Sequence, residues 1–172
     1  MTVSFLQSLC VCIASCVAVA AAVTDLASST IPNRLTLPVL LLAPLVHGFA
    51  AGPGALAASL LAALLCGLVP WLVFLRGGIG GGDVKLFAAL GSLLGCDTGL
   101  RVELGSLTCA ALYAGFALAF RGQLLRTLGR SLRLLSTLPP SAASDSSDSS
   151  LRLGPAIALA TLFTLWLGEL VP

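Results

Sequence analysis

The chain has 172 residues, of which 58% are hydrophobic and 9% are charged, and its mean hydropathy is +1.05. This composition excludes an ordinary soluble domain and predicts a protein embedded in a membrane. The net charge of +2 carries little information by itself, because the placement of Lys and Arg matters more in a membrane protein, and we expect no nucleic acid partner.

A spanning helix needs about 20 apolar residues, so the length leaves room for about six spans. We therefore predict an all-α polytopic membrane protein in which residues 1–172 form a single membrane-embedded domain. The predicted spans cover residues 3–23, 35–51, 55–75, 84–96, 104–120 and 153–170.

The first half of the chain supplies three of these spans. Residues 3–23 are uncharged, and although residues 18–22 resemble a signal-peptide cleavage site, no Lys or Arg precedes the run, so we expect a retained span. In the second span, Pro38 and Pro44 predict a kink rather than a break, because neighbouring helices can satisfy the freed carbonyls. His47 has no accompanying second ligand and is expected to be structural or interfacial.

A glycine-rich stretch, G-G-I-G-G-G at residues 77–82, separates the third span from the fourth. So many glycines disfavour a lipid-facing helix and predict a short loop at the membrane edge. The fourth span is short, and its small residues permit close packing against neighbours that shield it.

Two segments after the fifth span are expected to lie outside the bilayer. Residues 121–138 place arginines among leucines at helical spacing, which predicts an amphipathic basic helix on the membrane surface. Residues 139–150 are almost wholly Ser, Ala, Asp and Pro and cannot bury enough apolar surface to order themselves, so they are interpreted as a flexible linker.

Basic residues gather on one side of the predicted topology. The connections after the odd-numbered spans contain Arg34, Arg76, Lys85 and the arginines of residues 121–152, whereas the opposite connections contain Arg101. By the positive-inside rule, the side that is richer in Lys and Arg faces the cytoplasm. Asp25 and Asp83 each follow an odd-numbered span, so both are predicted at the cytoplasmic edge of the bilayer.

The cysteines give no sign of a metal site. They lie within or at the ends of apolar runs and show no paired C-x-x-C spacing; they are Cys10, Cys12, Cys16, Cys66, Cys96 and Cys109. We expect them to pack as small apolar residues between helices, and we expect neither a metal nor a cofactor.

Asp25 and Asp83 are the candidate catalytic residues. Burying a charge is costly, and two carboxylates in a poorly solvated site tend to share a proton. Such a pair suits amide hydrolysis, because one aspartate can take a proton from water while the other protonates the amide. Two structural alternatives remain open, namely that Asp83 caps the fourth helix and that Asp25 is a cap or a solvated loop acid.

Three stretches of the chain carry a resemblance to a known family. They are G-G-G-D at residues 80–83, continued by V-K-L and A-A-L-G, then Asp25 followed by I-P-N at residues 31–33, and G-P-A at residues 154–156. On these residues the chain resembles the type IV prepilin peptidases, membrane aspartic proteases marked by a G-x-G-D motif. The resemblance covers nearly the whole chain.

The resemblance implies an aspartic endopeptidase that removes the leader peptide of prepilins or pilin-like precursors at the cytoplasmic face of the bacterial inner membrane. Asp25 and Asp83 would form its catalytic pair. The implied partners are these precursors, the lipid bilayer and other pilus-assembly components. Larger members carry a cysteine-rich N-terminal insertion associated with methylation, which this chain lacks, so it resembles the small form found with Flp or tight-adherence pilus systems.

Supporting roles are expected for five residues, which are Gly80, Gly82, Lys85, Pro32 and Asn33. The glycines leave room for a substrate backbone or a neighbouring helix to approach the acid, and Pro32 suits the start of the second helix. For Lys85 two roles are open. It is either a charge partner of Asp83 or an interfacial residue whose stem reaches the headgroups.

A second hypothesis is a non-enzymatic membrane transport or assembly protein of the same topology. In that case the intramembrane acids would serve an ion or proton path. The two hypotheses differ in whether loss of an aspartate abolishes precursor cleavage or an ion flux.

Overall fold

The computed structural model describes residues 3–28, 30–120 and 154–170. These residues form six helices and no strand, which confirms the predicted all-α fold. The helices are α1 (Val3–Ser28), α2 (Asn33–Ala51), α3 (Pro53–Leu75), α4 (Gly81–Leu94), α5 (Cys96–Phe120) and α7 (Gly154–Leu170). The predicted surface helix at residues 121–138 and the linker at residues 139–150 lie outside the described residues.

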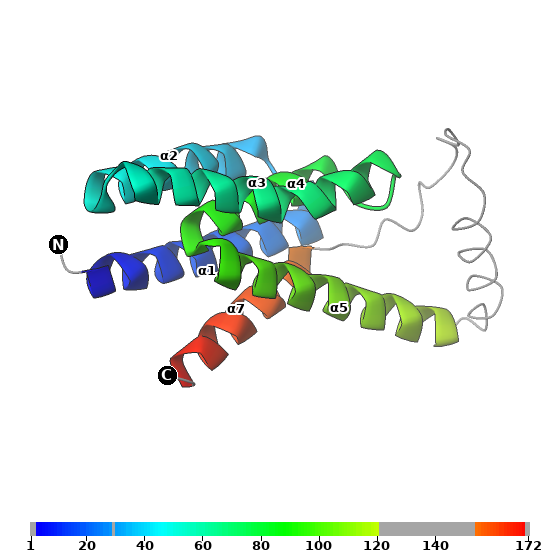
Figure 1. Ribbon diagram of the computed structural model, residues 1–172. Coiled ribbons are helices and arrows are strands. Elements are labelled where there is room, and N and C mark those ends of the chain that lie inside the picture. The colour runs from blue at the N-terminus through cyan, green and yellow to red at the C-terminus, as the bar shows by residue number, and fades with distance from the viewer. Residues whose placement is uncertain (1–2, 29, 121–153, 171–172) are drawn as a thin grey trace.

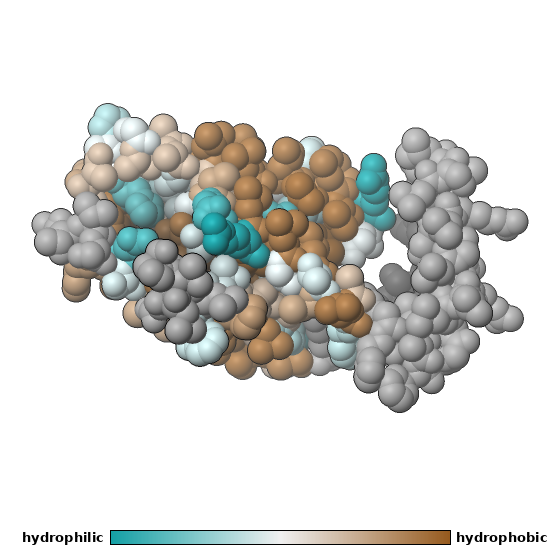
Figure 2. Space-filling view, turned by 60° about the horizontal axis from the view of Figure 1, so that its bottom comes forward, coloured by the Kyte–Doolittle hydropathy of each residue, from teal (hydrophilic) through white to brown (hydrophobic). Residues whose placement is uncertain are grey.

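Three of the helices, α1, α2 and α3, are long and apolar enough to cross a membrane. Their outward sides carry large exposed hydrophobic side chains such as Leu41, Leu64 and Phe49, and Phe49 is 91% exposed. Figure 2 shows that hydrophobic residues cover much of one face of the molecule. Soluble monomers rarely expose contiguous apolar surface on this scale, so the exposed sides of these helices are suited to contact lipid.

The remaining helices meet the length and composition of a span less well. The helix α4 has 14 residues, which at about 1.5 Å per residue makes it shorter than a hydrocarbon core of about 30 Å. The first turns of α5 contain Asp97, Arg101 and Glu103. In α7 the described apolar stretch, Gly154–Trp166, is also short. The count of six spans therefore stays a prediction.

The short helix α4 lies at the centre of the fold. It packs against α1, α2, α3 and α5, and its residues Leu86, Phe87, Leu90 and Leu93 belong to the main hydrophobic core. Figure 1 shows α2, α3 and α4 together in one part of the molecule and α1, α5 and α7 in the other. The neighbouring helices therefore shield α4 from the surroundings of the protein, as the short length and the small residues of this helix predict.

Small residues let α3, α4 and α5 approach one another closely. A Cβ atom added to Gly91 of α4 would lie 2.7 Å from Cys66 Cβ of α3, and one added to Gly99 of α5 would lie 2.8 Å from Cys66 Sγ. Neither position has room for a side chain. The Ser59 hydroxyl of α3 also donates a hydrogen bond to the Ser92 carbonyl oxygen of α4 at 2.6 Å. This packing fixes the position of α4 relative to α3.

Prolines do not interrupt the second helix. The helix α2 continues through Pro38 and Pro44, in agreement with the expectation that neither proline breaks it. Pro44 is buried, and α2 packs against both α3 and α4.

The helix boundaries near the two aspartates differ from the predicted ones. The first span was predicted at residues 3–23, and the helix α1 that contains these residues continues to Ser28, so Asp25 lies in its last turn rather than in a connection. The Thr24 and Ser28 hydroxyls donate to carbonyl oxygens within the same helix, and in this way polar residues can continue a helix. The helix α5 likewise begins at Cys96 rather than at residue 104, with an Asp97–Arg101 ion pair of 3.0 Å spanning one turn.

Candidate active site

Asp83 is held at the start of α4 by the residue that precedes the helix. Gly80 is the N-cap of α4 and has an extended backbone, and Asp83 is the third residue of the helix. The Gly80 amide donates a hydrogen bond to Asp83 Oδ2 at 3.3 Å. Asp83 therefore makes a local capping contact, although it is not itself the N-cap. Its side chain is buried, with 9% of the residue exposed.

Asp25 is held by a helix from the other end of the chain. It lies in the last turn of α1 and is buried. The amide of Gly154, the first residue of α7, donates a hydrogen bond to Asp25 Oδ2 at 2.9 Å. Asp25 is therefore neither a loop residue nor exposed to solvent, and of the alternatives left open by the sequence the solvated loop acid is wrong.

The two aspartates are close enough to interact electrostatically. Burial, and secondly the charge of Asp25, raise the pKa of Asp83 from its ordinary value of 3.8 to about 6, while the hydrogen bond from Gly80 lowers it. Asp83 belongs to α4, which is not one of the three helices that are long and apolar enough to span the membrane. A raised pKa keeps Asp83 available as a proton donor, which is one of the two roles that acid and base catalysis by an aspartate pair requires.

The segment that precedes α2 packs directly against the start of α4. A Cβ atom added to Gly82 would lie 3.0 Å from Ile31 Cβ and 3.4 Å from the Ile31 backbone. Pro32 is the N-cap of α2, and its carbonyl oxygen accepts a hydrogen bond from the Leu35 amide at 3.0 Å. The structure thus brings the I-P-N and G-x-G-D stretches together, and the absence of a side chain at Gly82 permits the contact.

A hydrogen bond also joins these two stretches. Lys85 Nζ donates to Asn33 Oδ1 at 2.8 Å, across 52 residues of sequence. Lys85 is partly buried and Asn33 is exposed. The structure therefore gives Lys85 a partner that neither of its two predicted roles includes. Through this contact the first turns of α2 and α4 are tied together beside Asp83.

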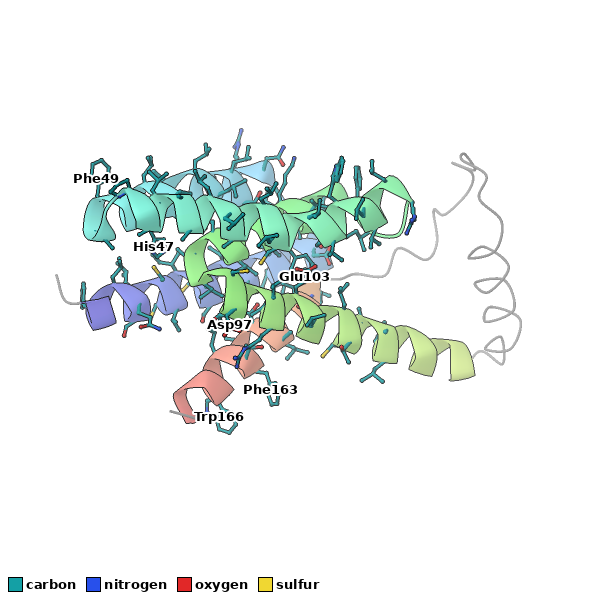
Figure 3. All side chains as sticks on the ribbon, viewed as in Figure 1. His47, Phe49, Asp97, Glu103, Phe163 and Trp166 are labelled. Carbon is teal, nitrogen blue, oxygen red and sulfur yellow. The ribbon has the colours of Figure 1, made fainter. Side chains whose placement is uncertain are left out.

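Two features of the interior carry no role in the sequence-based interpretation. The Gly154 contact to Asp25 is one, although the G-P-A stretch was noticed as part of the family resemblance. The other is Glu103, a residue of α5 with 2% exposure whose Oε2 has no hydrogen-bond partner among the described residues. Figure 3 shows its side chain in the interior, while Asp97 lies on the outside of the same helix. The presence of an acid in a mainly apolar helix is the signal that could have identified it.

His47 lies far from the aspartates along α2. Its Nε2 is 3.2 Å from the Leu93 carbonyl oxygen and 3.9 Å from Cys10 Sγ. These contacts join α2 to the end of α4 and to α1, in agreement with a structural role. Within the described part of the chain, no group of three or more His, Cys, Asp or Glu residues could hold a metal ion.

Comparison with known proteins gives one family and one curated relative. The model of the type IV leader peptidase family matches residues 12–119, a range that contains both aspartates. The chain is also 36% identical over 111 residues to the prepilin leader peptidase/N-methyltransferase of Bacillus subtilis (strain 168). The match covers 60% of this chain and 42% of the relative, so the chain spans less than half of that protein's length. No solved structure matches the chain.

Proposed function

Because the chain belongs to the type IV leader peptidase family, we propose that it is a membrane aspartic endopeptidase that cleaves the leader peptide from prepilins or pilin-like precursors. The name of the Bacillus relative supports the substrate class. The proposal covers leader removal alone and does not extend to the methyltransferase activity in that name.

The observation that carries the proposal is the convergence of Asp25 and Asp83. They come from the end of α1 and the start of α4, both are buried, and each accepts a backbone hydrogen bond. The charge of Asp25 acts on Asp83. A purely structural pair of acids would gain nothing from lying so close, because two neighbouring carboxylates in a poorly solvated site disfavour each other's ionisation.

The pair can hydrolyse a peptide bond without a covalent intermediate. One ionised carboxylate takes a proton from water, whose oxygen attacks the scissile carbonyl carbon, while the protonated carboxyl group gives its proton to the carbonyl oxygen. As the resulting diol collapses, the newly protonated carboxyl group gives its proton to the amine nitrogen, one diol hydroxyl gives its proton to the other carboxylate, and the C–N bond breaks. Both stages use only the two aspartates and one water molecule.

We further propose that the site faces the cytoplasm. Three basic residues lie at helix ends near the pair in the element order, namely Arg34 at the start of α2, Arg76 directly after α3 and Lys85 near the start of α4. All three lie at the same end of the helices as Asp25 and Asp83, and the positive-inside rule favours the cytoplasmic side for that end. In a bacterium this means the inner membrane. The resemblance to the small form suggests precursors of Flp or tight-adherence pili, with other pilus-assembly components as partners.

The test is a cleavage assay in isolated membranes that contain this protein and an epitope-tagged prepilin. The readout is a shift of the precursor by the size of its leader. We expect cleavage by the unaltered protein and a loss of at least about 100-fold for Asp25→Asn and for Asp83→Asn, because each removes one proton-transferring group. Asp97→Asn is the matched control, since Asp97 is an exposed acid of α5 outside the site.

The same assay separates the enzyme from the transport alternative. If the chain is a transport or assembly protein, the precursor stays uncut with the unaltered protein and with every variant. For a transport protein, an ion flux across the membrane would instead depend on the aspartates. Cleavage that persists in both Asp→Asn variants would rule out the aspartate pair as the catalytic centre.

A further inference from the structure

The start of α7 is built against the carboxylate of Asp25. Gly154 is the first residue of the helix and is buried, and its amide lies 2.9 Å from Asp25 Oδ2, across 129 residues of sequence. The amides in the first turn of a helix have no partner within the helix, and the helix dipole favours a negative charge at this end. The contact therefore fixes the position of the Asp25 carboxylate against the start of α7.

The space around this contact admits glycine alone. A Cβ atom added to Gly154 would lie 2.7 Å from Asp25 Cβ, 2.8 Å from Asp25 Oδ2 and 3.1 Å from Asp25 Cγ. Pro155 follows and has no amide hydrogen, so it cannot compete with Gly154 as a donor, and its fixed backbone angle suits the first turn of a helix. In the described part of the chain, Gly154 is thus the residue of the Gly-Pro pair whose amide can donate to the carboxylate.

The environment of Asp83 differs in a way that makes the pair asymmetric. Its backbone hydrogen bond, from Gly80, is longer at 3.3 Å. Its burial and the nearby Asp25 charge both favour the protonated form. One carboxylate therefore receives the end of a helix that favours an anion, and the other is left where a neutral acid is favoured.

We propose that Gly154 is a positioning residue of the peptidase, whose amide holds Asp25 as the anion that accepts the proton from water and leaves Asp83 as the proton donor. This inference rests on the proposed function and deepens it, because it assigns the two aspartates to separate roles. The Asp25 carboxylate accepts a proton from water as the water oxygen bonds to the carbonyl carbon. The Asp83 carboxyl group gives its proton to the carbonyl oxygen.

The second stage restores the starting state. One hydroxyl of the diol returns its proton to Asp83, the amine nitrogen takes the proton from Asp25, and the C–N bond breaks. The products are a carboxylic acid and an amine, and the net change is the addition of one water molecule. Asp25 is again ionised and Asp83 is again protonated, so the contact with Gly154 serves the same form at the start of every cycle.

The first experiment compares two glycine substitutions at the packing surface of α7. Gly154→Ala keeps the amide but forces the added methyl group against Asp25. The control is Gly105→Ala in α5, where a Cβ would meet the Ala160 side chain of α7 at 3.3 Å. We expect Gly154→Ala to lower kcat about 100-fold with KM little changed, as misplacement of a catalytic group by about 1 Å can do, while Gly105→Ala cleaves like the unaltered protein.

The second experiment removes the hydrogen bond without adding atoms that clash. Cell-free translation of the full chain into liposomes, with glycolic acid in place of Gly154, replaces the donating N–H by an ester oxygen. The ester changes the donor to Asp25 and leaves in place Asp83 of α4, the acid with which Asp25 interacts in the described part of the chain. We expect the acidic limb of the kcat/KM profile to move to higher pH, which a merely structural role for Gly154 would not cause.

The outcomes separate this inference from the function on which it rests. If the unaltered protein does not cleave the tagged prepilin, the proposed function fails and the inference falls with it. If the unaltered protein cleaves and the ester variant has the same kcat and pH profile, Gly154 is no positioning residue while the function stands. The ester result decides the matter even if Gly154→Ala fails to accumulate in the membrane.

Discussion

Buried acids lie in two regions of the molecule, and the two regions differ in the hydrogen-bond partners that these acids have. At one end of the helices Asp25 and Asp83 each accept a hydrogen bond from a backbone amide, and the charge of Asp25 acts on Asp83. In α5, Glu103 is buried more completely, with 2% exposure, yet one of its oxygens has no partner among the described residues. The degree of burial alone would therefore rank Glu103 above both aspartates as a catalytic candidate.

The difference shows that a functional acid is identified by what surrounds it. A carboxylate that works as an anion needs donors, because an ionised group without them is too costly to bury. The N-cap of α4 and the first residue of α7 supply those donors to the aspartates, while Glu103 lies beyond the first turn of α5, where helix amides are paired with carbonyl oxygens of the same helix. We therefore expect the aspartate pair to carry the chemistry and Glu103 to be a neutral acid.

The largest effect should come from removing both carboxylates of the pair. We expect the double variant Asp25→Asn with Asp83→Asn to cleave no more slowly than either single variant, because groups that act as a unit are strongly non-additive. Rates measured in the membrane assay for the two single variants and the double variant form the test. A double variant whose loss equals the product of the single losses would show that the aspartates act independently.

The next effect concerns pH and distinguishes Asp83 from Glu103. If Asp83 donates a proton with a pKa of about 6, cleavage should fall as the pH rises above that value, by about tenfold for each further pH unit. The measurement is kcat/KM between pH 5 and pH 8. Glu103→Gln should leave this descending limb in place. If the descending limb disappears in Glu103→Gln, the titrating acid is Glu103 and not Asp83.

The proton on Asp83 should also affect the free energy of unfolding, and the raised pKa sets the direction in which that free energy changes with pH. The folded pKa of Asp83 lies above its ordinary value of 3.8, so the folded state binds the proton more tightly. The resulting stabilisation is fully present below about pH 3.8 and is lost as the pH rises through about 6. Thermal unfolding in detergent should show this decline for the unaltered protein and a smaller decline for Asp83→Asn.

A smaller effect is expected where the two motif stretches are tied together. Lys85→Met and Asn33→Ala each remove the 2.8 Å hydrogen bond between the starts of α4 and α2. Because the contact is solvent-exposed, we expect a cost of about 1 kcal/mol or less in stability. Cleavage should fall by less than for either aspartate. A double-mutant cycle of Lys85→Met and Asn33→Ala tests the contact. If the losses in the free energy of unfolding of the two single variants add up to that of the double variant, the two side chains are not energetically coupled.

Much of this arrangement could be predicted from the sequence because the constraints are local. Apolar runs of span length fixed three helices, and the G-x-G-D and D-x5-I-P-N stretches identified the aspartates that the structure brings together. The glycines of residues 77–82 also predicted a turn before α4, which begins at Gly81 after a positive φ at Gly77.

What the sequence could not provide are contacts between distant helices. The Gly154 amide reaches Asp25 only because α7 packs against α1, and Lys85 finds Asn33 only because α2 and α4 lie side by side. The end of α1 was misplaced for a different reason. Polar residues after residue 23 were interpreted as a loop, but Thr24 and Ser28 satisfy their hydroxyls within the helix.

The smallest effect is expected for Glu103→Gln. If Glu103 is carried as a neutral acid, a neutral amide of the same shape should leave cleavage unchanged. It should also leave the thermal stability equal or raise it, because the variant can never bear a buried charge that lacks a full set of partners. Cleavage in membranes and thermal unfolding in detergent test this, with Asp83→Asn beside it. A loss of activity comparable with that of Asp83→Asn would mean that the unpaired oxygen of Glu103 faces the chemistry after all, and that the two acidic regions form one site.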